Sequence, residues 1–355
     1  MSGLSNARVI VAGAGAFGSA IALRLVQAGA RVTLIDPDLG FARGASAVAA
    51  GMLAPAFEAV LDPETNLPFD LLCAARDLWP AFAQTIGRDI GLVRAGAAWV
   101  DLPGLEPRAQ AVRAALTALG ARIEAAPPAT EIRGLEMVFT PEDWRLSPSA
   151  ALPAMLGAFR AAGGTAVRGA LGAVEPGCAV LKDGGRMAAD RVVVATGAGG
   201  AALAPELSAL TPIKGQIVSY PDLEPPSGAP TLRCLGGYAT GGEDGLSVGA
   251  TMEPGARDLI ADPATIARLH ALAGRLYPQT QAMEPVAAVG VRAASPDGRP
   301  MVGLSQAPGA ILAVGARRNG WLLAPLVAQI VEAYLAGRDP GPYASLFEAR
   351  RFAVV

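Results

Sequence analysis

Two arginines stand directly before an Asn-Gly step in the segment GARRNGWLLAP (residues 315–325), and an almost uncharged stretch follows them. Another arginine, Arg292, lies in a second apolar segment, GVRAASPDGRPMVG (290–303). A guanidinium group directs two donors at one carboxylate or phosphate, so these positions suit the binding of an anion. An arginine in an apolar stretch is more often a surface residue or part of a structural ion pair, and we expect Arg317 to face solvent or a neighbouring acid. For Arg292 and Arg318 we expect an anionic ligand. Each arginine follows an apolar strand-like run that ends near a glycine, and ligands of parallel sheets bind at such strand ends.

A glycine-rich turn near the start of the chain has the spacing of a dinucleotide-binding loop. Gly13, Gly15 and Gly18 form G-x-G-x-x-G between a strand-like run and a helical pattern. The first glycine permits a tight turn, the second lets a pyrophosphate approach the backbone, and the third lets helix and strand pack closely. Asp36 closes the next strand-like run, where its carboxylate can accept hydrogen bonds from ribose hydroxyls. The motif predicts a bound dinucleotide without saying which one.

The segment RGASAVAAGMLAP (43–55) consists almost entirely of small residues. Small side chains let a backbone lie flat against a large ligand, and Ser46 can hydrogen-bond a phosphate. A well-packed alanine-rich helix would have the same composition. From the segment alone, the alanine-rich helix is the better interpretation.

Other kinds of catalytic site lack candidate residues. His270 is the only histidine, and it lies in an amphipathic helical pattern over residues 263–279, so we expect it to be structural. A Ser-His-Asp hydrolase or a histidine-dependent hydride donor site therefore has no other candidate. The only lysines, Lys182 and Lys214, give little support for Schiff-base chemistry. Ligands for a metal ion are not found at the needed spacing, so we expect no metal.

Composition narrows the class of protein further. The chain has 355 residues, of which 52% are hydrophobic, and a formal net charge of −2. Its basic residues are thinly spread, which argues against a nucleic-acid partner. Cys73, Cys178 and Cys234 are far apart, which favours a reducing compartment over a disulfide framework. No apolar stretch of membrane-spanning length is free of both charges and helix breakers, so we expect a cytoplasmic protein.

The elements that must position these residues can be outlined from the same patterns. Residues 8–36 predict a strand, a glycine turn, a helix and a second strand, and strand-like runs ending in glycine recur at 190–199 and 309–320. The segments 91–140 and 213–292 contain short strand-like runs separated by turn residues. We expect an α/β protein in which a Rossmann-like nucleotide-binding domain (1–90, 146–212 and 289–355) carries an inserted, mostly antiparallel substrate domain (91–145 and 213–288). Arg292 and Arg318 would then lie on separate strands of the nucleotide-binding domain.

The chain resembles the D-amino-acid oxidase family of FAD-dependent amine oxidases, and within it the bacterial glycine oxidases of the thiamine pathway. The resemblance is carried by VAGAGAFGSAIALRL, VTLID, ASAVAAGMLAP, VVVATGAG, TPIKGQ, VGATMEPG, GVRAASPDGRPMVG and VGARRNGWLLAP. These segments follow the order of the family and span nearly the whole chain. The resemblance implies a Rossmann-like FAD-binding domain and non-covalently bound FAD.

The resemblance also implies which residues form the sites. The residues implied for FAD binding are Gly13, Gly15, Ala16, Phe17, Gly18, Asp36, Pro37, Ala45, Ser46, Ala50, Gly51, Met52, Val174, Thr196, Gly197, Arg318, Asn319, Gly320, Trp321 and Leu322. The residues implied for the substrate are Tyr238, Met252, Arg292 and Arg318. Arg318 would face the substrate carboxylate, and a helix capped by Asn319 would direct its positive end at the flavin. Pro325 would lie near the first turn of that helix, where a missing N–H group is tolerated.

The function implied is FAD-dependent oxidative deamination of a small amino acid or N-methyl amino acid, with glycine and sarcosine as first candidates. Hydride transfer to flavin N5 would give an imine and then a 2-oxo acid, and oxygen would be reduced to hydrogen peroxide. A D-amino-acid dehydrogenase that passes electrons to a quinone or carrier has the same site. An NAD-dependent dehydrogenase shares only the glycine loop, and a non-catalytic flavin-binding sensor or scaffold is the alternative of another class. A tRNA-modifying member of the family is disfavoured by the acidic pI. The substrate, the electron acceptor and a homo-oligomeric state are left open.

Overall fold

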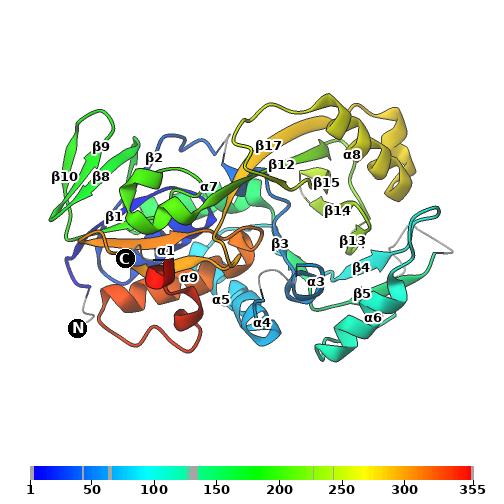
Figure 1. The fold of residues 1–355 in the computed structure, drawn as a ribbon, viewed down its shortest axis with the longest axis horizontal. Coiled ribbons are helices and arrows are strands. Elements are labelled where there is room, and N and C mark those ends of the chain that lie inside the picture. Colours follow the sequence, from blue (N-terminus) through cyan, green and yellow to red (C-terminus); the bar gives the residue numbers. More distant parts are fainter. Residues whose placement is uncertain are drawn as a thin grey trace.

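The computed structural model describes residues 4–41, 44–62, 66–125, 127, 135–226, 228–242 and 244–352. Two sheets lie side by side along the long axis of the molecule and are joined by the long strands β12 and β17, as Figure 1 shows. Both chain termini lie at the end of the molecule that holds the first sheet. Within the described ranges, no helix is long and apolar enough to cross a membrane.

The first sheet has six strands in the order β18-β19-β11-β1-β2-β7. Its strands are β1 (Arg8–Ala12), β2 (Arg31–Asp36), β7 (Thr165–Arg168), β11 (Arg191–Val194), β18 (Met301–Leu304) and β19 (Ala310–Val314). All neighbours pair in parallel except β18, which runs antiparallel to β19. The strand, glycine turn, helix and strand predicted for residues 8–36 are confirmed, with α1 (Ala16–Gln27) between β1 and β2.

Alternation along the strands places two different layers on the two faces of this sheet. Val9 and Val11 point into a core shared with helices, whereas Ile10 and Ala12 point into a core shared with a small three-stranded sheet. The helices are α1, α4 (Phe69–Asp77), α5 (Trp79–Ile86), α7 (Pro148–Ala161) and α9 (Gly320–Leu335). The small sheet consists of β8 (Leu171–Glu175), β9 (Cys178–Leu181) and β10 (Arg186–Ala188). The first sheet is therefore buried on both faces, as expected for parallel strands.

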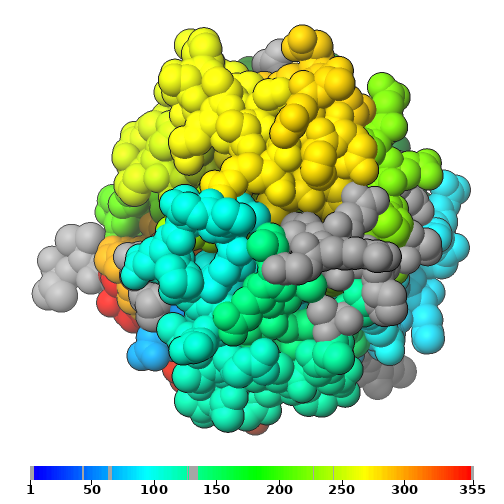
Figure 2. Space-filling model, turned by 90° about the vertical axis from the view of Figure 1, so that its right-hand side faces the viewer, coloured from blue at the N-terminus to red at the C-terminus, as the bar shows by residue number. Residues whose placement is uncertain are grey.

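The second sheet has eight strands and is mostly antiparallel, as predicted, with one parallel pair between β4 and β13. Its strands are β4 (Ala97–Val100), β5 (Met137–Thr140), β12 (Thr211–Tyr220), β13 (Thr231–Cys234), β14 (Gly237–Gly242), β15 (Gly245–Gly249), β16 (Glu253–Pro254) and β17 (Val286–Ala294). Helix α8 (Pro263–Leu276) packs on one face of this sheet, and α6 (Ala109–Ala118) with α3 (Pro55–Leu61) packs on the other. Figure 2 shows the outer end of this part, with the yellow segment that includes α8 above the cyan and green segments that include α6.

Three details differ from the sequence-based expectations. Arg292 does not belong to the nucleotide-binding sheet, because it lies on β17 and pairs with Ile213 of β12 in the second sheet. Strand β17 also runs through residues 288 and 289, where a domain boundary was expected. Lys214, in the segment TPIKGQ for which the family resemblance implied a loop before the substrate-domain sheet, lies within β12. The sequence of β17, VAAVGVRAA, lacks the strict apolar–polar alternation that would mark a strand of this length.

Short elements of secondary structure lie between the first and second sheets, near the predicted ligand sites. Helix α2 (Ala45–Val48) is a single turn, so the segment that begins at residue 43 does not form a long alanine-rich helix; residues 42 and 43 lie outside the described part. It leads into β3 (Met52–Leu53), which pairs with β6 (Trp144–Arg145). Helix α3 follows directly after β3 and carries Glu58 between the sheets. Short 3₁₀ turns complete the chain at Ala201–Leu203, Pro205–Ala209, Pro278–Ala282, Ala344–Phe347 and Ala349–Phe352.

Candidate active site

Two adjoining cavities lie where the two sheets meet. The larger, of about 440 Å³, is lined by the glycine loop after β1, by α2, by the loop after β11 and by the segment between β19 and α9. The smaller, of about 280 Å³, is lined by β3, α3 and strands of the second sheet. Ala49, Arg292, Arg318 and Trp321 line both cavities. A ligand in the larger cavity would therefore share a wall with a ligand in the smaller one.

The larger cavity has the construction of a dinucleotide cleft. Gly13 has a φ of +107°, a conformation that L side chains rarely adopt, and a side chain at Gly18 would clash with the carbonyl of Gly13. The turn thus brings the N-terminus of α1 to the cleft, where its first N–H groups have no acceptor within the helix. Ser46 also lines the cleft, and its hydroxyl accepts a hydrogen bond from Ala16 N at 3.0 Å. The serine hydroxyl hydrogen is left for a ligand.

Asp36 lies at the end of β2 and is held toward the cleft by backbone groups. Its two carboxylate oxygens accept hydrogen bonds from Ala14 N and Asp38 N, each at 2.7 Å. A carboxylate has about four lone-pair sites, so both oxygens can still accept hydrogen bonds from ribose hydroxyls. The residues present therefore fit a dinucleotide with a diphosphate beside α1 and a ribose beside Asp36.

Helix α9 begins at the junction of the two cavities, but its first turn differs from the prediction. Asn319 occupies the N-cap position without a side-chain cap hydrogen bond. Pro325 lies a few residues inside the helix, as expected, but past the first turn, so the carbonyl of Trp321 lacks its helical donor. The indole Nε1 of Trp79 donates to that carbonyl at 3.0 Å and replaces the missing bond. The indole of Trp321 in turn donates to the carbonyl of Ser46 at 3.0 Å, which ties α9 to the small-residue segment.

Arg292 reaches the smaller cavity from β17 across the neighbouring strand. Its Nη1 donates to the carbonyl of Thr251 at 3.0 Å and lies 3.2 Å from Sδ of Met252. Gly215 on β12 leaves room for this guanidinium, because a Cβ atom there would overlap Nη1. Burial lowers the pKa of Arg292 below its ordinary value, and the nearby charge of Arg318 adds to the effect. In the described residues Arg292 forms no ion pair, so its cavity favours an anion.

Tyr238 and Met252 line the same cavity, which places all four residues implied for the substrate together. Tyr238 lies on β14, where it pairs with Arg233 of β13 and with Gly249 of β15. Burial raises the pKa of Tyr238, although the charges of nearby arginines oppose the shift. Its hydroxyl group is therefore protonated at neutral pH and can donate a hydrogen bond.

Glu58 joins two arginines of this cavity and was missed in the sequence. Its Oε1 accepts hydrogen bonds from Arg233 at 3.1 Å and from Arg318 at 3.0 Å. Burial alone would raise the pKa of Glu58, but the charges of Arg318 and Arg233 outweigh it and hold the pKa below its ordinary value. Glu58 is therefore ionised and a poor proton acceptor. A single acid in the apolar run PAFEAVL was the only sequence signal for this role.

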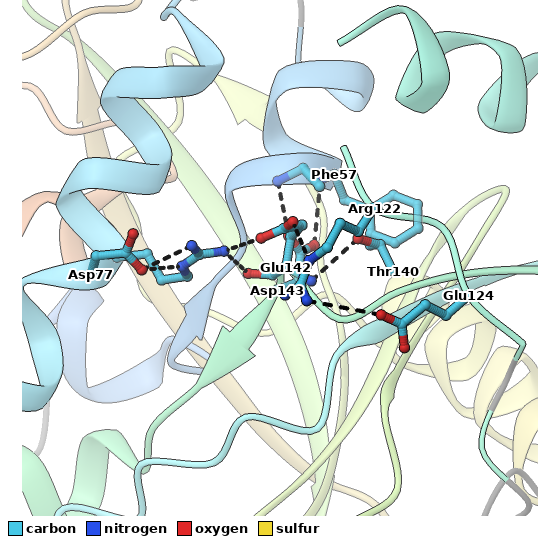
Figure 3. A network of polar contacts seen from close by, with 9 residues as sticks. Phe57, Asp77, Arg122, Glu124, Thr140, Glu142 and Asp143 are labelled. Carbon is cyan, nitrogen blue, oxygen red and sulfur yellow. Dashed lines mark hydrogen bonds and ion pairs between the residues drawn. The ribbon is translucent and has the colours of Figure 1, made fainter. Parts of the chain in front are cut away.

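Asp143 holds the start of the helix that carries Glu58. Its two carboxylate oxygens accept hydrogen bonds from Ala56 N at 2.8 Å and from Phe57 N at 3.3 Å, so it caps α3 from a distant part of the chain. Figure 3 shows this contact beside Glu142, which pairs with Arg122 and also with Arg76 of α4. Burial raises the pKa of Asp143 to about 7, although Arg233 and the two backbone donors oppose the shift.

Arg317 pairs with Asp62, which follows the last residue of α3. Of the two expectations for Arg317, solvent and a neighbouring acid, the structure selects the acid, because both side chains are largely buried. Adjacent arginines of the loop before α9 thus bind one acid within α3 and one at its C-terminal end, with Arg318 on Glu58 and Arg317 on Asp62. Together these pairs fix α3 against the start of α9.

The family resemblance implied a set of residues for the FAD and substrate sites. Most of these residues line the larger cleft, the smaller cavity or both. The larger cleft is lined by Gly13, Gly15, Ala16, Phe17, Asp36, Ala45, Ser46, Thr196, Gly197, Arg318, Gly320 and Trp321. The smaller cavity is lined by Ala50, Gly51, Met52, Tyr238, Met252, Arg292, Arg318, Asn319 and Trp321. Gly18, Pro37, Val174 and Leu322 line neither. Gly18 acts in packing, Leu322 is buried in the core, and Val174 lies on β8 against the small-sheet core.

His270 has the structural role that was predicted. It lies on α8, and its Nδ1 is 2.7 Å from the hydroxyl of Tyr220 on the sheet below. It does not line either of the two site cavities.

Comparisons with known proteins agree with this geometry. The sequence profile of the DAO family, described as FAD dependent oxidoreductase, matches residues 8–334. A glycine oxidase of Pseudomonas aeruginosa is 30% identical over 372 residues, which cover 95% of this chain and 98% of that protein. The structure of glycine oxidase from Geobacillus kaustophilus superposes with a TM-score of 0.83 at 25% identity, covering 98% of this chain and 99% of that chain. The structure of iminodiacetate oxidase from Chelativorans sp. BNC1 has the same fold, with a TM-score of 0.81 at 22% identity, covering 96% of this chain and 98% of that chain.

Proposed function

Because the chain belongs to the DAO family and is therefore an FAD-dependent oxidoreductase that acts on amines, we propose that it oxidises a small amino acid or N-methyl amino acid, with glycine and sarcosine as first candidates. The products would be the imine, which hydrolyses to a 2-oxo acid and ammonia or an amine, and hydrogen peroxide from oxygen. In this proposal the parts of the chain around the first sheet hold FAD, and the second sheet holds the substrate. FAD, when bound, would accept the two electrons and the hydrogen of the α-carbon together, as a hydride.

The observation that carries the proposal is the position of Arg292. It is a largely desolvated cation beside Tyr238 and Met252, without an ion pair in the described residues, at the junction of a dinucleotide cleft and a small cavity. A substrate carboxylate would supply the missing negative charge in a bidentate geometry. The hydroxyl of Tyr238 would donate a further hydrogen bond to the same carboxylate.

The charges around the cavity support a substrate with one carboxylate. Four arginines, at positions 233, 292, 317 and 318, face three acids, Glu58, Asp62 and Asp143. Even with all three acids ionised, the cluster would lack one negative charge, and the raised pKa of Asp143, about 7, makes the deficit larger near neutral pH. A zwitterionic amino acid brings that charge to Arg292, and its amine has to lose a proton before it can be oxidised.

The chain does not supply an obvious base for that proton. The described lining of the smaller cavity contains no histidine, and its only acid, Glu58, is held ionised at low pKa by two arginines. The amine would therefore lose its proton to water on binding. The contribution of the protein is then to orient the α-carbon and to exclude solvent, with no side-chain base.

An anaerobic screen tests the proposal. Amino acids and N-methyl amino acids are added to the yellow holoenzyme without oxygen, and the loss of the flavin absorption band is followed. Glycine or sarcosine is expected to bleach the band, and admission of air is expected to restore it with one equivalent of peroxide. Bleaching that air does not reverse would instead favour a D-amino-acid dehydrogenase that uses a quinone or carrier. If no amine bleaches the band, the chain is a flavin-binding protein without this activity.

The variant Arg292→Met tests the site itself. Acetate is a carboxylate without an amine, and its binding can be followed by the change it causes in flavin absorption. Loss of one member of a largely buried charge pair is expected to weaken acetate binding by about 2–4 kcal/mol. Flavin content should equal that of Arg268→Met, a control at an exposed position of α8. Acetate binding of wild-type strength in Arg292→Met would show that Arg292 is structural.

A further inference from the structure

The loop of residues 255–262, between β16 and α8, reaches from the second sheet across the dinucleotide cleft. Its Arg257 donates from Nη1 to the carbonyl of Ala198 at 3.3 Å, in the loop that follows β11 of the first sheet. Arg257 and Leu259 both line the larger cleft, together with the glycine loop and Ser46. This loop, which follows strand β16 of the second sheet, therefore closes the cleft on the side of residues 196–199.

Ion pairs and hydrogen bonds fix this loop to β12. Nζ of Lys214 lies 2.6 Å from Oδ1 of Asp258, and the side chain of Lys214 is only 7% exposed. Asp258 Oδ1 also accepts a hydrogen bond from Ile260 N at 3.1 Å. The amide oxygen of Gln216 accepts one from Asp262 N at 2.7 Å. On the other side of Arg257, Gly255 N donates to the carbonyl of Pro212 on β12 at 2.8 Å. The loop is thus held on both sides of Arg257 and Leu259, the two side chains that line the cleft.

The apolar side chains of the loop are unusually exposed. Leu259 is 49% exposed and Ile260 is 75% exposed, the latter being the largest value among the exposed large hydrophobic residues of the described part. Because Leu259 lines the cleft, a bound dinucleotide would cover part of this surface.

Arg257 differs from the other arginines of the cleft in its charge partners. Four arginines line it, at positions 257, 292, 317 and 318. Arg317 and Arg318 are paired with Asp62 and Glu58, and Arg292 extends into the smaller cavity. In the described residues Arg257 forms no ion pair. A dinucleotide brings two negative charges on its diphosphate, and the N-terminus of α1 offers only about half a positive charge to them.

We propose that Arg257 binds the diphosphate of FAD and that residues 255–262 form a strap that retains the cofactor. A guanidinium group matches the geometry of phosphate oxygens, and it would add a full positive charge to the cleft that the N-terminus of α1 also lines. The Lys214–Asp258 pair sets the position of the strap, and Leu259 covers the cofactor beside it. This inference rests on FAD dependence and not on the identity of the amine.

The first test is the affinity for FAD of Arg257→Gln. Holoenzyme is diluted to nanomolar concentrations, and the rise of flavin fluorescence on release gives the dissociation constant. We expect the constant to increase about tenfold, as for the loss of one charge-assisted hydrogen bond. The increase should be larger at low ionic strength, because salt screens an exposed charge pair. Arg268→Gln makes the same change of charge at an exposed site on α8 and should bind FAD as the wild type does. Equal constants for the two variants would overturn the proposal.

The second test uses the wild-type chain and does not depend on a variant. Trypsin cleaves after exposed arginines, and Arg257 lies in an exposed part of the loop. Cleavage after Arg257 is followed by mass spectrometry with saturating FAD and with FAD below its dissociation constant. Saturating FAD should slow this cut at least severalfold while leaving the cut after Arg268 unchanged. A cut after Arg257 that is equally fast in both conditions would show that the strap does not contact the cofactor. Both readouts are independent of amine oxidation, so they stand apart from the proposed activity.

Discussion

The guanidinium group of Arg292 lies directly over Gly215 of the neighbouring strand. Any residue larger than glycine at position 215 would overlap this group. The space that holds the predicted carboxylate-binding arginine is therefore made by a glycine far away in the sequence.

Gly215→Ala is expected to displace Arg292 without unfolding the protein. A methyl group at residue 215 would overlap Nη1, which is the mobile end of a long side chain and can move away. Acetate binding, followed by flavin absorption, should weaken at least tenfold, and the thermal unfolding temperature should change by no more than a few degrees. Gly169→Ala is the control, because a Cβ atom there makes only ordinary contacts at 3.5 Å. Unchanged acetate affinity in Gly215→Ala would contradict the placement of Arg292.

Glu58→Gln is expected to destabilise the fold at neutral pH. The change leaves Arg233 and Arg318 without their shared carboxylate, and breaking a buried pair in this way costs about 3 kcal/mol. The pKa of Glu58 is held below its ordinary value of 4.5, so its ionised form stabilises the folded state above that pH. This contribution is lost as the pH falls through the lowered value. Urea unfolding should therefore show a large difference between wild type and Glu58→Gln at pH 7 that shrinks below pH 4.5. A difference independent of pH would indicate that lost packing is responsible.

Asp143→Asn should show the opposite dependence on pH. Burial raises the pKa of Asp143 from 3.8 to about 7, so the folded chain keeps a proton that the unfolded chain releases between these values. The contribution of Asp143 to stability is therefore greatest at low pH and declines as the pH rises toward 7. In urea unfolding, the wild type should gain stability relative to Asp143→Asn when the pH is lowered from 7 to 5, by up to about 1.4 kcal/mol per pH unit. Asp222→Asn, at an exposed turn, is the control and should show no such trend.

FAD is expected to be bound without a covalent link. None of the three cysteines lines the larger cleft in the described part of the chain, and Cys234, which lines the smaller cavity, has its pKa raised to about 11 by burial. A thiol that is protonated at neutral pH is a poor nucleophile. Acid precipitation followed by filtration should release all of the yellow colour into the filtrate. Colour that stays with the polypeptide would contradict this expectation.

The sequence by itself determined the local parts of the dinucleotide cleft. The spacing of the sequence was enough to identify Gly13, Gly18 and Asp36. These residues form a turn, a helix–strand contact and a strand end, and all three features lie within a single segment of about 30 residues. The structural role of His270 followed in the same way from the period of an amphipathic helix. Such features are encoded locally, so one segment is enough to recognise them.

Only the tertiary structure decided the charge pairing of the site. Glu58 meets Arg233 and Arg318, which are 175 and 260 residues away, and no local pattern connects these positions. The sheet of Arg292 was assigned wrongly for the same reason, because strand partners depend on contacts between distant segments. The free energy of a buried charge depends on which partners the fold brings within a few ångströms, and that arrangement exists only after both sheets have formed.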